Sequence, residues 1–163
     1  LLNNLLKELG YNGKPKFYFV HGIMNRKEMN ALYNHPRIKA YLTMTRGEGF
    51  GLPILESAVH GLPVIATNWS AHTEFLNHGK WLKLDYELKE IDSSRVDNQI
   101  FIKGSKWASV DENDFKAKIK KVKKSYQVPS RQAKKLSSIL AKKYSKDAIF
   151  NRYDEVLSEL NFD

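Results

Sequence analysis

The stretch 46–66 constrains the fold of this chain more than any other part of the sequence. Its three glycines, Gly47, Gly49 and Gly51, lie within five residues, and Pro53 follows where a helix would begin. Proline fits the first turn of a helix, because the N–H that it lacks would have no partner there. Apolar residues then recur at helical spacing. The pattern predicts a turn that leads from a strand into a helix.

Two glutamates flank this turn. Seven residues separate Glu48 from Glu56. Between them, backbone N–H groups at the start of a helix can bind an anion, and Gly49 and Gly51 let the backbone approach a ligand closely. A carboxylate accepts two hydrogen bonds from a vicinal diol, each worth about 1.5 to 3 kcal/mol. The turn therefore suits a sugar diphosphate, with the ribose of a nucleotide on Glu56.

Other glycine-rich binding motifs fail on spacing. Leu52 stands where a dinucleotide fingerprint that begins at Gly47 needs its third glycine, and no Gly-Lys-Ser/Thr follows at P-loop spacing. The alternative is a purely structural turn with a glutamate near the positive end of a helix, which many α/β proteins have.

These residues resemble a known family, the retaining glycosyltransferases of the family 4 type (glycosyl transferases group 1). That family carries two glutamates seven residues apart in a Glu-Gly-Phe-Gly-Leu-Pro run, then a helix and a Gly-x-Pro-Val-Ile-Ala strand. Here the run occupies 48–53, Glu56 follows, and 61–66 matches the strand. The resemblance implies an α/β fold with a Rossmann-like parallel sheet flanked by helices. This would be the nucleotide-sugar-binding C-terminal half of a GT-B fold, with a helical C-terminus.

The resemblance also implies a role for each residue of the run. Glu48 would meet the donor sugar as the catalytic glutamate, and Glu56 would hold the ribose of a UDP- or GDP-sugar. The diphosphate and sugar would meet the backbone of Gly49, Phe50, Gly51 and Leu52. A hexose would be transferred with retention and without a metal ion or other cofactor. Glu74 matches a further glutamate of the family, which we interpret as structural.

Three more residues complete the predicted site. Ligands of open parallel sheets bind outside the carboxyl ends of the strands. In the family, the loop equivalent to 21–24 lies beside the nucleobase, so Gly22 and Ile23 are expected to contact the base. A simple turn fits that loop equally well. Arg46 precedes the glycines and could face a phosphate, although an exposed arginine is the usual case.

Hydrophobic periodicity predicts alternating helices and strands along the chain. The expected helices are 1–9, 27–34, 52–60 and 70–76, and the expected strands are 17–20, 38–43, 63–67 and 81–84. Asn68 and Ser70 are interpreted as caps of the helix at 70–76.

The second half of the chain is expected to be mostly helical. Residues 85–106 are polar and irregular, with a possible strand at 99–103. A helix then begins either at a capping box formed by Ser109 and Glu112 or at Asp111, and it turns three apolar side chains inward. These side chains are Phe115, Ile119 and Val122. Residues 130–160 are expected to form the C-terminal helices.

Length and composition set further limits. A chain of 163 residues suits one domain, 1–163, and the absence of cysteine excludes disulfides and thiolate metal sites. The five histidines make no zinc spacing, so no metal is predicted. No apolar run approaches the roughly 18 residues that would cross a membrane. We expect a cytoplasmic domain.

The family's nucleotide half normally begins with a strand that ends in Gly-Arg and is followed by Lys-Gly, a basic pair that clamps the diphosphate. This sequence begins after that point. We therefore expect a fragment without the first strand and the N-terminal acceptor-binding domain, which would be its partner, and we expect no turnover by the fragment alone. An apolar face on the last helix is expected to pack on its own domain or to drive self-association. It consists of Ile149, Phe150, Tyr153, Val156, Leu157 and Leu160.

The chain carries a net charge of +9, concentrated between Lys103 and Lys146. A solvated helical face explains this best. An alternative is a non-catalytic basic module that lies on anionic lipid at the inner membrane face, or binds nucleic acid. Nucleic acid is not expected, because no aromatic residues alternate with the lysines. Another alternative is a sugar-nucleotide epimerase of the same fold.

Overall fold

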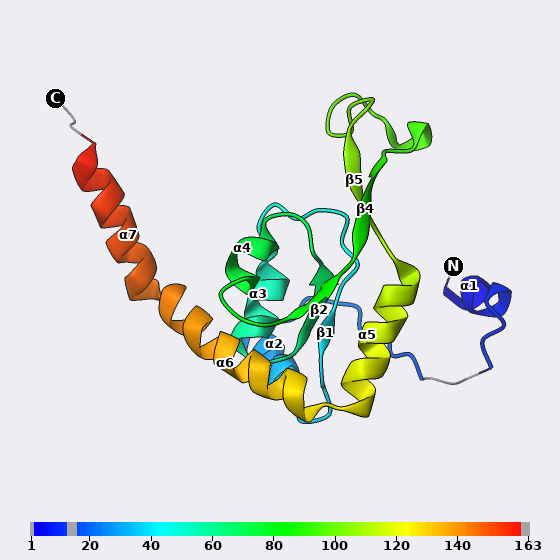
Figure 1. The fold of residues 1–163 in the computed structure, drawn as a ribbon, viewed down its shortest axis with the longest axis horizontal. Coiled ribbons are helices and arrows are strands. Elements are labelled where there is room, and N and C mark those ends of the chain that lie inside the picture. The colour runs from blue at the N-terminus through cyan, green and yellow to red at the C-terminus, as the bar shows by residue number, and fades with distance from the viewer. Residues whose placement is uncertain (1, 13–15, 161–163) are drawn as a thin grey trace.

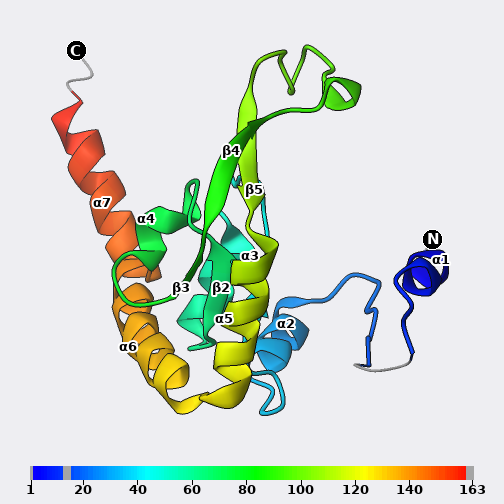
Figure 2. The ribbon, with the colours of Figure 1, turned by 45° about the vertical axis from the view of Figure 1, so that its right-hand side comes forward.

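The computed structural model describes residues 2–12 and 16–160 of the chain. They form an α/β fold around a sheet of three parallel strands (Figures 1 and 2). The first half contains α1 Leu2–Glu8, α2 Arg26–Tyr33, β1 Tyr41–Leu42, α3 Leu52–Val59, β2 Val64–Thr67, α4 His72–Leu76 and β3 Leu82–Leu84. The second half contains β4 Tyr86–Glu90, the short 3-10 helix η1 Ser93–Arg95, β5 Lys106–Val110, α5 Glu112–Lys124, α6 Gln127–Lys143 and α7 Lys146–Glu159.

The central strand of the sheet is β2. It pairs in parallel with β1, where Tyr41 lies opposite Val64, and with β3, where Ile65 lies opposite Leu82. All four residues of β2 are buried. A parallel sheet is buried on both faces because helices cover it on both sides. This arrangement confirms the expected parallel sheet flanked by helices.

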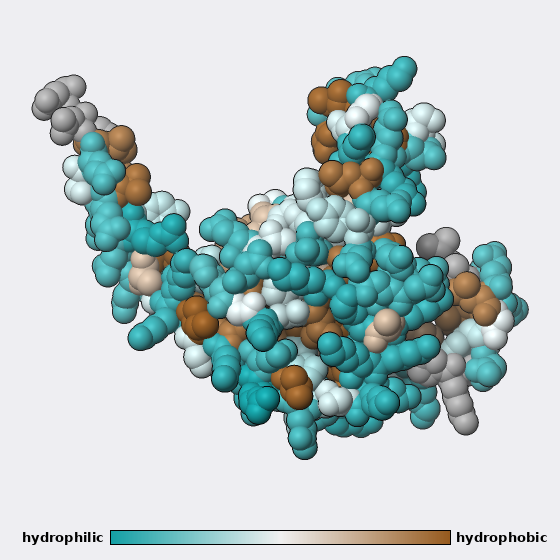
Figure 3. Space-filling model, viewed as in Figure 1, coloured by the Kyte–Doolittle hydropathy of each residue, from teal (hydrophilic) through white to brown (hydrophobic). Residues whose placement is uncertain are grey.

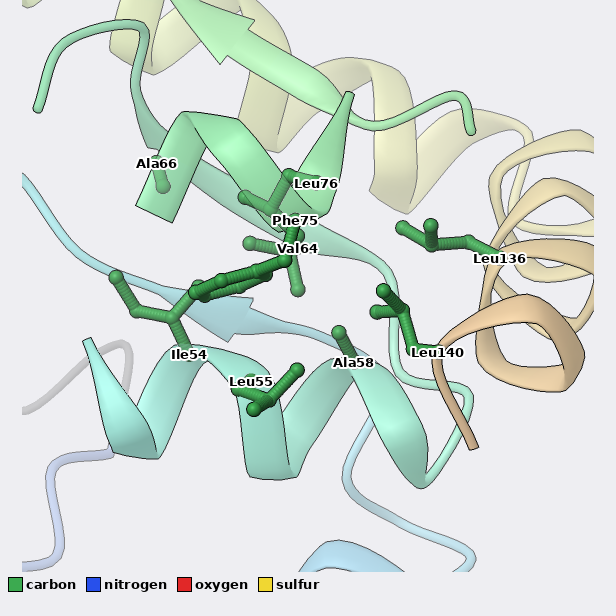
Figure 4. Packing of buried hydrophobic residues seen from close by; sticks show 9 residues of the cluster. All are labelled: Ile54, Leu55, Ala58, Val64, Ala66, Phe75, Leu76, Leu136 and Leu140. Atoms are coloured by element: carbon green, nitrogen blue, oxygen red, sulfur yellow. The ribbon is translucent and has the colours of Figure 1, made fainter. Parts of the chain in front are cut away.

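Each face of β2 packs against different helices, because successive side chains of a strand point to opposite faces. Val64 and Ala66 join a core with α3, α4 and α6 (Figure 4). Its other buried members are Ile54, Leu55, Ala58, Phe75, Leu76, Leu136 and Leu140. Ile65 points the other way and packs with Leu84 and with Val122 of α5. Two helix layers therefore fix the sheet from which the glycine-rich turn emerges.

Besides α1, which lies apart from the sheet and the other helices, two parts of the chain project from this body (Figures 1 and 2). The antiparallel strands β4 and β5 form a hairpin that stands away from the sheet, and α7 leaves the body in a different direction (Figures 1 and 2). No residue of α7 is buried. Figure 3 shows apolar side chains on both projections. The apolar face expected on the last helix is therefore exposed here, and most of it does not pack on its own domain.

Two of the strands expected in the first half of the chain differ from the described structure: one pairs with no strand, and the other is shorter than expected. The apolar run 17–20 is extended but pairs with no strand, and its four side chains are 61 to 82% exposed. High β-propensity alone does not make a strand, since the ladder needs a partner. The expected strand 38–43 is shortened to β1, although Thr43 N–H still donates to Ile65 O (2.9 Å).

The expected strand at 99–103 is also wrong. The Asp97 carboxylate accepts hydrogen bonds from the N–H groups of Gln99, Ile100 and Phe101, all at 2.9 Å. Aspartate side chains compete with strand pairing in this way and favour a turn. The strands of this region are instead β4 and β5, with the turn between them.

The helix after this hairpin begins at Asp111, whose side chain accepts a hydrogen bond from Asp114 N–H. The alternative cap, Ser109, lies within β5. Val122 is buried as expected and Phe115 is half-buried, but Ile119 is 37% exposed because it lies at the open edge beside β1. The expected C-terminal helices are confirmed as α6 and α7.

Candidate functional site

The glycine-rich turn occupies residues 45–51, between β1 and the start of α3, at the carboxyl end of the sheet. Gly51 caps α3 with a φ of +88°, and its carbonyl accepts hydrogen bonds from Ile54 and Leu55. Only glycine adopts such a φ without strain. A Cβ on Gly51 would also lie 3.1 Å from the Cβ of His72, which is fully buried beneath the turn. The backbone and the packing therefore both require glycine here.

Three consecutive amides of this turn are free. Within the described residues, the N–H groups of Gly49, Phe50 and Gly51 donate to no other group. They precede the first turn of α3, where Pro53 takes an early position as expected. The start of a helix carries a partial positive charge and unpaired N–H groups, which together bind anions such as phosphate.

Glu48 lies at the beginning of these free amides, and its backbone is held by a residue from another connection. Glu48 N–H donates to Ser70 Oγ (2.9 Å), and the Ser70 hydroxyl donates to Glu48 O (2.8 Å). Glu48 is half-buried. The burial of Tyr41 and the nearby negative charge of Glu48 raise the pKa of Tyr41. Neither hydrogen bond uses the Glu48 carboxylate, which is thus open to a ligand.

Glu56 lies on the exposed flank of α3. The buried Tyr33 of α2 donates its hydroxyl to Glu56 Oε2 over a long 3.4 Å. Burial, the charge of Glu56, the nearby Tyr41 and this hydrogen bond raise the pKa of Tyr33 to about 12. Tyr33 therefore keeps its proton at neutral pH and orients one carboxylate oxygen, while the rest of the carboxylate can accept hydroxyl groups.

Arg46 is joined to the β4–β5 hairpin. Its guanidinium lies 4.0 Å from the centre of the Trp107 ring, and its carbonyl accepts a hydrogen bond from Ala108 N–H (3.1 Å). A cation over an indole face is stabilised by the ring quadrupole. To reach a phosphate, Arg46 would have to leave this ring, so the phosphate contact stays a prediction.

Comparison with protein-family models shows to which family the chain belongs. The model named Glycosyl transferases group 1 matches residues 2–135. The match includes the turn, both glutamates and the three parallel strands. The chain belongs to this family. No curated protein matches the chain.

Membership of the group 1 glycosyltransferases confirms the resemblance seen in the sequence. The domain is the Rossmann-like C-terminal half of the GT-B fold, and it belongs to a transferase that uses a nucleotide-sugar donor. About half of α6, residues 127–135, lies within the match, whereas α7 lies beyond it. The exposed helix is therefore outside the part that the family model describes.

Phe50 anchors the glycine-rich turn through its ring. Its ring lies 5.5 Å from that of Phe75 and 6.4 Å from that of Tyr144, although 42% of Phe50 is exposed. A hollow of about 370 Å³ opens beside it, lined by Glu74, Tyr144 and residues of α7. Leu52 is exposed at the start of α3. These aromatic contacts attach the turn to the core and to the end of α6.

The remaining predicted site residues are not brought into contact with the turn. Gly22 and Ile23 lie on the exposed connection before α2, and Ile23 is fully exposed. No hydrogen bond in the described residues joins this connection to 45–51. Their contact with a nucleobase stays a prediction.

Two further observations concern metals and membranes. The described residues contain no group of three histidine, cysteine, aspartate or glutamate side chains that could hold a metal ion. Among the helices that the structure describes, none has the length and apolar character needed to cross a membrane.

The sequence analysis missed two residues that hold the site, and it gave one of them another role. Ser70 was expected to cap α4 together with Asn68, but α4 begins after Ala71 without a side-chain cap. Ser70 instead contacts Glu48, and Tyr33 contacts Glu56. These pairs are 22 and 23 residues apart in the sequence, so no local pattern indicates them.

Proposed function

We propose that this domain binds the donor of a reaction that transfers a hexose from a UDP- or GDP-sugar to an acceptor, with retention at the anomeric carbon. The observation that carries the proposal is the row of three free amides, Gly49 to Gly51, which stands between Glu48 and Glu56 in the sequence. A nucleotide sugar offers an anionic diphosphate between a sugar and a ribose. The order of the protein groups matches the order of the ligand groups.

The free amides would bind the diphosphate and stabilise the charge that develops on it as the glycosidic bond breaks. Preorganised N–H groups at a helix start suit this role, because they need not reorient during the reaction. Glu48 would orient the hexose at the end of the row and stabilise positive charge on the sugar. Its backbone is fixed by Ser70, and its carboxylate is free of those hydrogen bonds.

Glu56 would accept hydrogen bonds from both ribose hydroxyl groups. The Tyr33 hydroxyl holds the Glu56 carboxylate from the side of α2. Each hydrogen bond to a charged group contributes about 1.5 to 3 kcal/mol, so the loss of Glu56 removes a large part of the affinity for a nucleotide.

The basic helices suit a peripheral contact with an anionic membrane, which we include in the proposal. The range 112–143 holds eleven lysines and arginines and two acidic residues, so it accounts for the net charge of +9. Clustered lysines attract anionic lipid by about 1 kcal/mol each near the surface. Sedimentation with phosphatidylserine vesicles tests this contact, and no binding at low salt would contradict it.

The experiment that tests donor binding is a titration of the chain with UDP and with GDP, followed by amide NMR shifts at millimolar nucleotide. We expect shifts that cluster at residues 49–56 for one nucleotide. Glu56→Ala should weaken its binding about tenfold or more, from the loss of a charged hydrogen bond. Glu155→Ala, another exposed helical glutamate but on α7, is the matched control and should leave binding unchanged. No shift at 49–56 with either nucleotide would contradict the proposal.

A further inference from the structure

The connection between β2 and α4 contains a residue in an unusual backbone conformation. Ser70 has a φ of +86°, in the left-handed region that favours glycine. A side chain in this region is strained, and such strain persists only where the surroundings hold it in place. The hydroxyl group is therefore where a reason for serine at this position should lie.

The Ser70 hydroxyl forms hydrogen bonds with both backbone polar groups of Glu48. It accepts from Glu48 N–H (2.9 Å) and donates to Glu48 O (2.8 Å). A hydroxyl group has one donor and two acceptor lone pairs, so a single Oγ can make both bonds at once. Neither alanine nor glycine can make either bond. These two hydrogen bonds hold the residue directly before the free amides of Gly49 to Gly51.

Neighbouring hydrogen bonds hold Ser70 and the turn in place. The carbonyl of Ser70 accepts two hydrogen bonds from Thr73, one from its N–H (3.0 Å) and one from its hydroxyl (2.7 Å). The Thr67 hydroxyl donates to Thr45 O (2.6 Å), at the other end of the turn. The last residue of β2 and the connection after it therefore fix the turn 45–51 at two points, Thr45 and Glu48.

We infer that Ser70 is a positioning residue of the donor site, whose hydroxyl holds the backbone of Glu48 so that the Glu48 carboxylate and the following amides face the donor together. This inference rests on the donor-binding role proposed above. Ser70 acts through Glu48 and need not touch the donor itself. A helix-capping role does not explain its hydroxyl, because α4 has no side-chain cap.

Three substitutions separate the hydroxyl group from the backbone strain. Ser70→Gly removes the hydroxyl and relieves the strain, since glycine accepts a positive φ. Ser70→Ala removes the hydroxyl and keeps the strain. Ser70→Thr keeps the hydroxyl but adds a β-branch, which is disfavoured at a positive φ. If Ser70 is purely structural, the affinity for the donor should fall only in variants whose stability falls. If Ser70 is a positioning residue, Ser70→Gly should lose affinity without losing stability.

The first measurement is hydrogen exchange of the Glu48 amide in the ligand-free chain. Without the Ser70 hydroxyl we expect Glu48 to exchange about fivefold faster, which corresponds to the loss of one hydrogen bond. This should hold in Ser70→Gly and Ser70→Ala, while Ser70→Thr keeps the protection. We expect the melting temperature of Ser70→Gly to equal or exceed that of the wild type, and that of Ser70→Thr to fall.

The second measurement is affinity, by NMR titration with UDP-glucose or GDP-mannose according to which nucleotide the wild type binds. We expect Ser70→Gly to weaken nucleotide-sugar binding about fivefold and to change binding of the nucleotide alone less, because Glu48 is proposed to face the sugar. Ser70→Thr should stay near the wild type. If Ser70 had a purely structural role, its substitution would weaken binding of the nucleotide sugar and of the nucleotide by the same factor.

Each outcome decides the inference. Faster exchange and weaker nucleotide-sugar binding in the stable Ser70→Gly variant support it. Unchanged exchange of Glu48, or faster exchange with unchanged affinity, overturns it while the donor-binding proposal stands. If the wild type binds neither nucleotide, the donor-binding proposal fails, and the role of Ser70 in a donor site fails with it.

Discussion

The strand β2 and the helix α7 show opposite ways of using apolar residues. Every residue of β2 is buried between helices, whereas α7 contains no buried residue although it carries five large apolar side chains. Burial of apolar surface is the main favourable term in folding. The comparison indicates that the stability of the domain resides around β2, whose neighbour β1 leads into the glycine-rich turn, and that α7 adds little to it.

The largest effect is expected from a truncation beside β2. Leu140 of α6 is fully buried in the core that includes Val64 and Phe75. Leu140→Ala should lower the free energy of unfolding by about 2 to 5 kcal/mol, because it removes buried apolar surface and leaves a cavity. Urea unfolding followed by circular dichroism measures this loss. A change below about 1 kcal/mol would mean that the core around β2 is not the stable part, since even ordinary core truncations exceed it.

A smaller, pH-dependent effect is expected where the body meets the hairpin. Asp114 of α5 accepts hydrogen bonds from Asp85 N–H (2.9 Å), directly before β4, and from Lys118. Partial burial alone would raise the pKa of Asp114, but these hydrogen bonds and the charge of Lys118 hold it below its usual value of 3.8. The stabilisation is therefore complete above the unfolded-state pKa and is lost as the pH falls through the lowered folded-state pKa.

Asp114→Asn should cost about 1 kcal/mol at pH 7, from a weakened charged hydrogen bond, and almost nothing once Asp114 is protonated. Urea midpoints of both proteins between pH 7 and pH 2 test this convergence. A constant difference over the whole range would show that the Asp114 charge does not join the hairpin to the body.

The smallest effect is expected from the same leucine truncation on α7. Leu157 is about half exposed. Leu157→Ala should change the free energy of unfolding by no more than about 0.5 kcal/mol, as is usual for surface positions. Urea unfolding beside Leu140→Ala gives the direct comparison. A loss of more than about 1 kcal/mol, or one that grows with protein concentration, would show that α7 is covered in solution, by its own body or by a second copy.

The parts of the fold that the sequence predicts well are those that depend on neighbouring residues. Pro53 and the apolar spacing after it are local signals, and they correctly predicted α3 and β2. The run 17–20 failed because a strand also needs a partner, which no local pattern supplies. The run 99–103 failed because the Asp97 carboxylate takes three backbone N–H groups into a turn.

The same distinction applies to the site. The glycines and glutamates stand in one short motif, so their residue types and spacing indicate the ligand chemistry directly. The residues that hold them come from elsewhere: Tyr33 reaches Glu56 from α2, and Ser70 reaches Glu48 from the connection after the neighbouring strand β2. Such pairs depend on how β-strands and helices are arranged in space, and no local pattern of residues reveals that arrangement.

The contact between Arg46 and Trp107 makes the fluorescence of Trp107 sensitive to the state of the glycine-rich turn. The emission of an indole depends on the charges around it, and a guanidinium lies 4.0 Å from the centre of this ring, two residues before Glu48. If a phosphate draws Arg46 away, Trp107 loses its closest cation and its fluorescence changes. Under that condition, binding of an anion at the turn would be followed by the fluorescence of Trp107, without any attached dye.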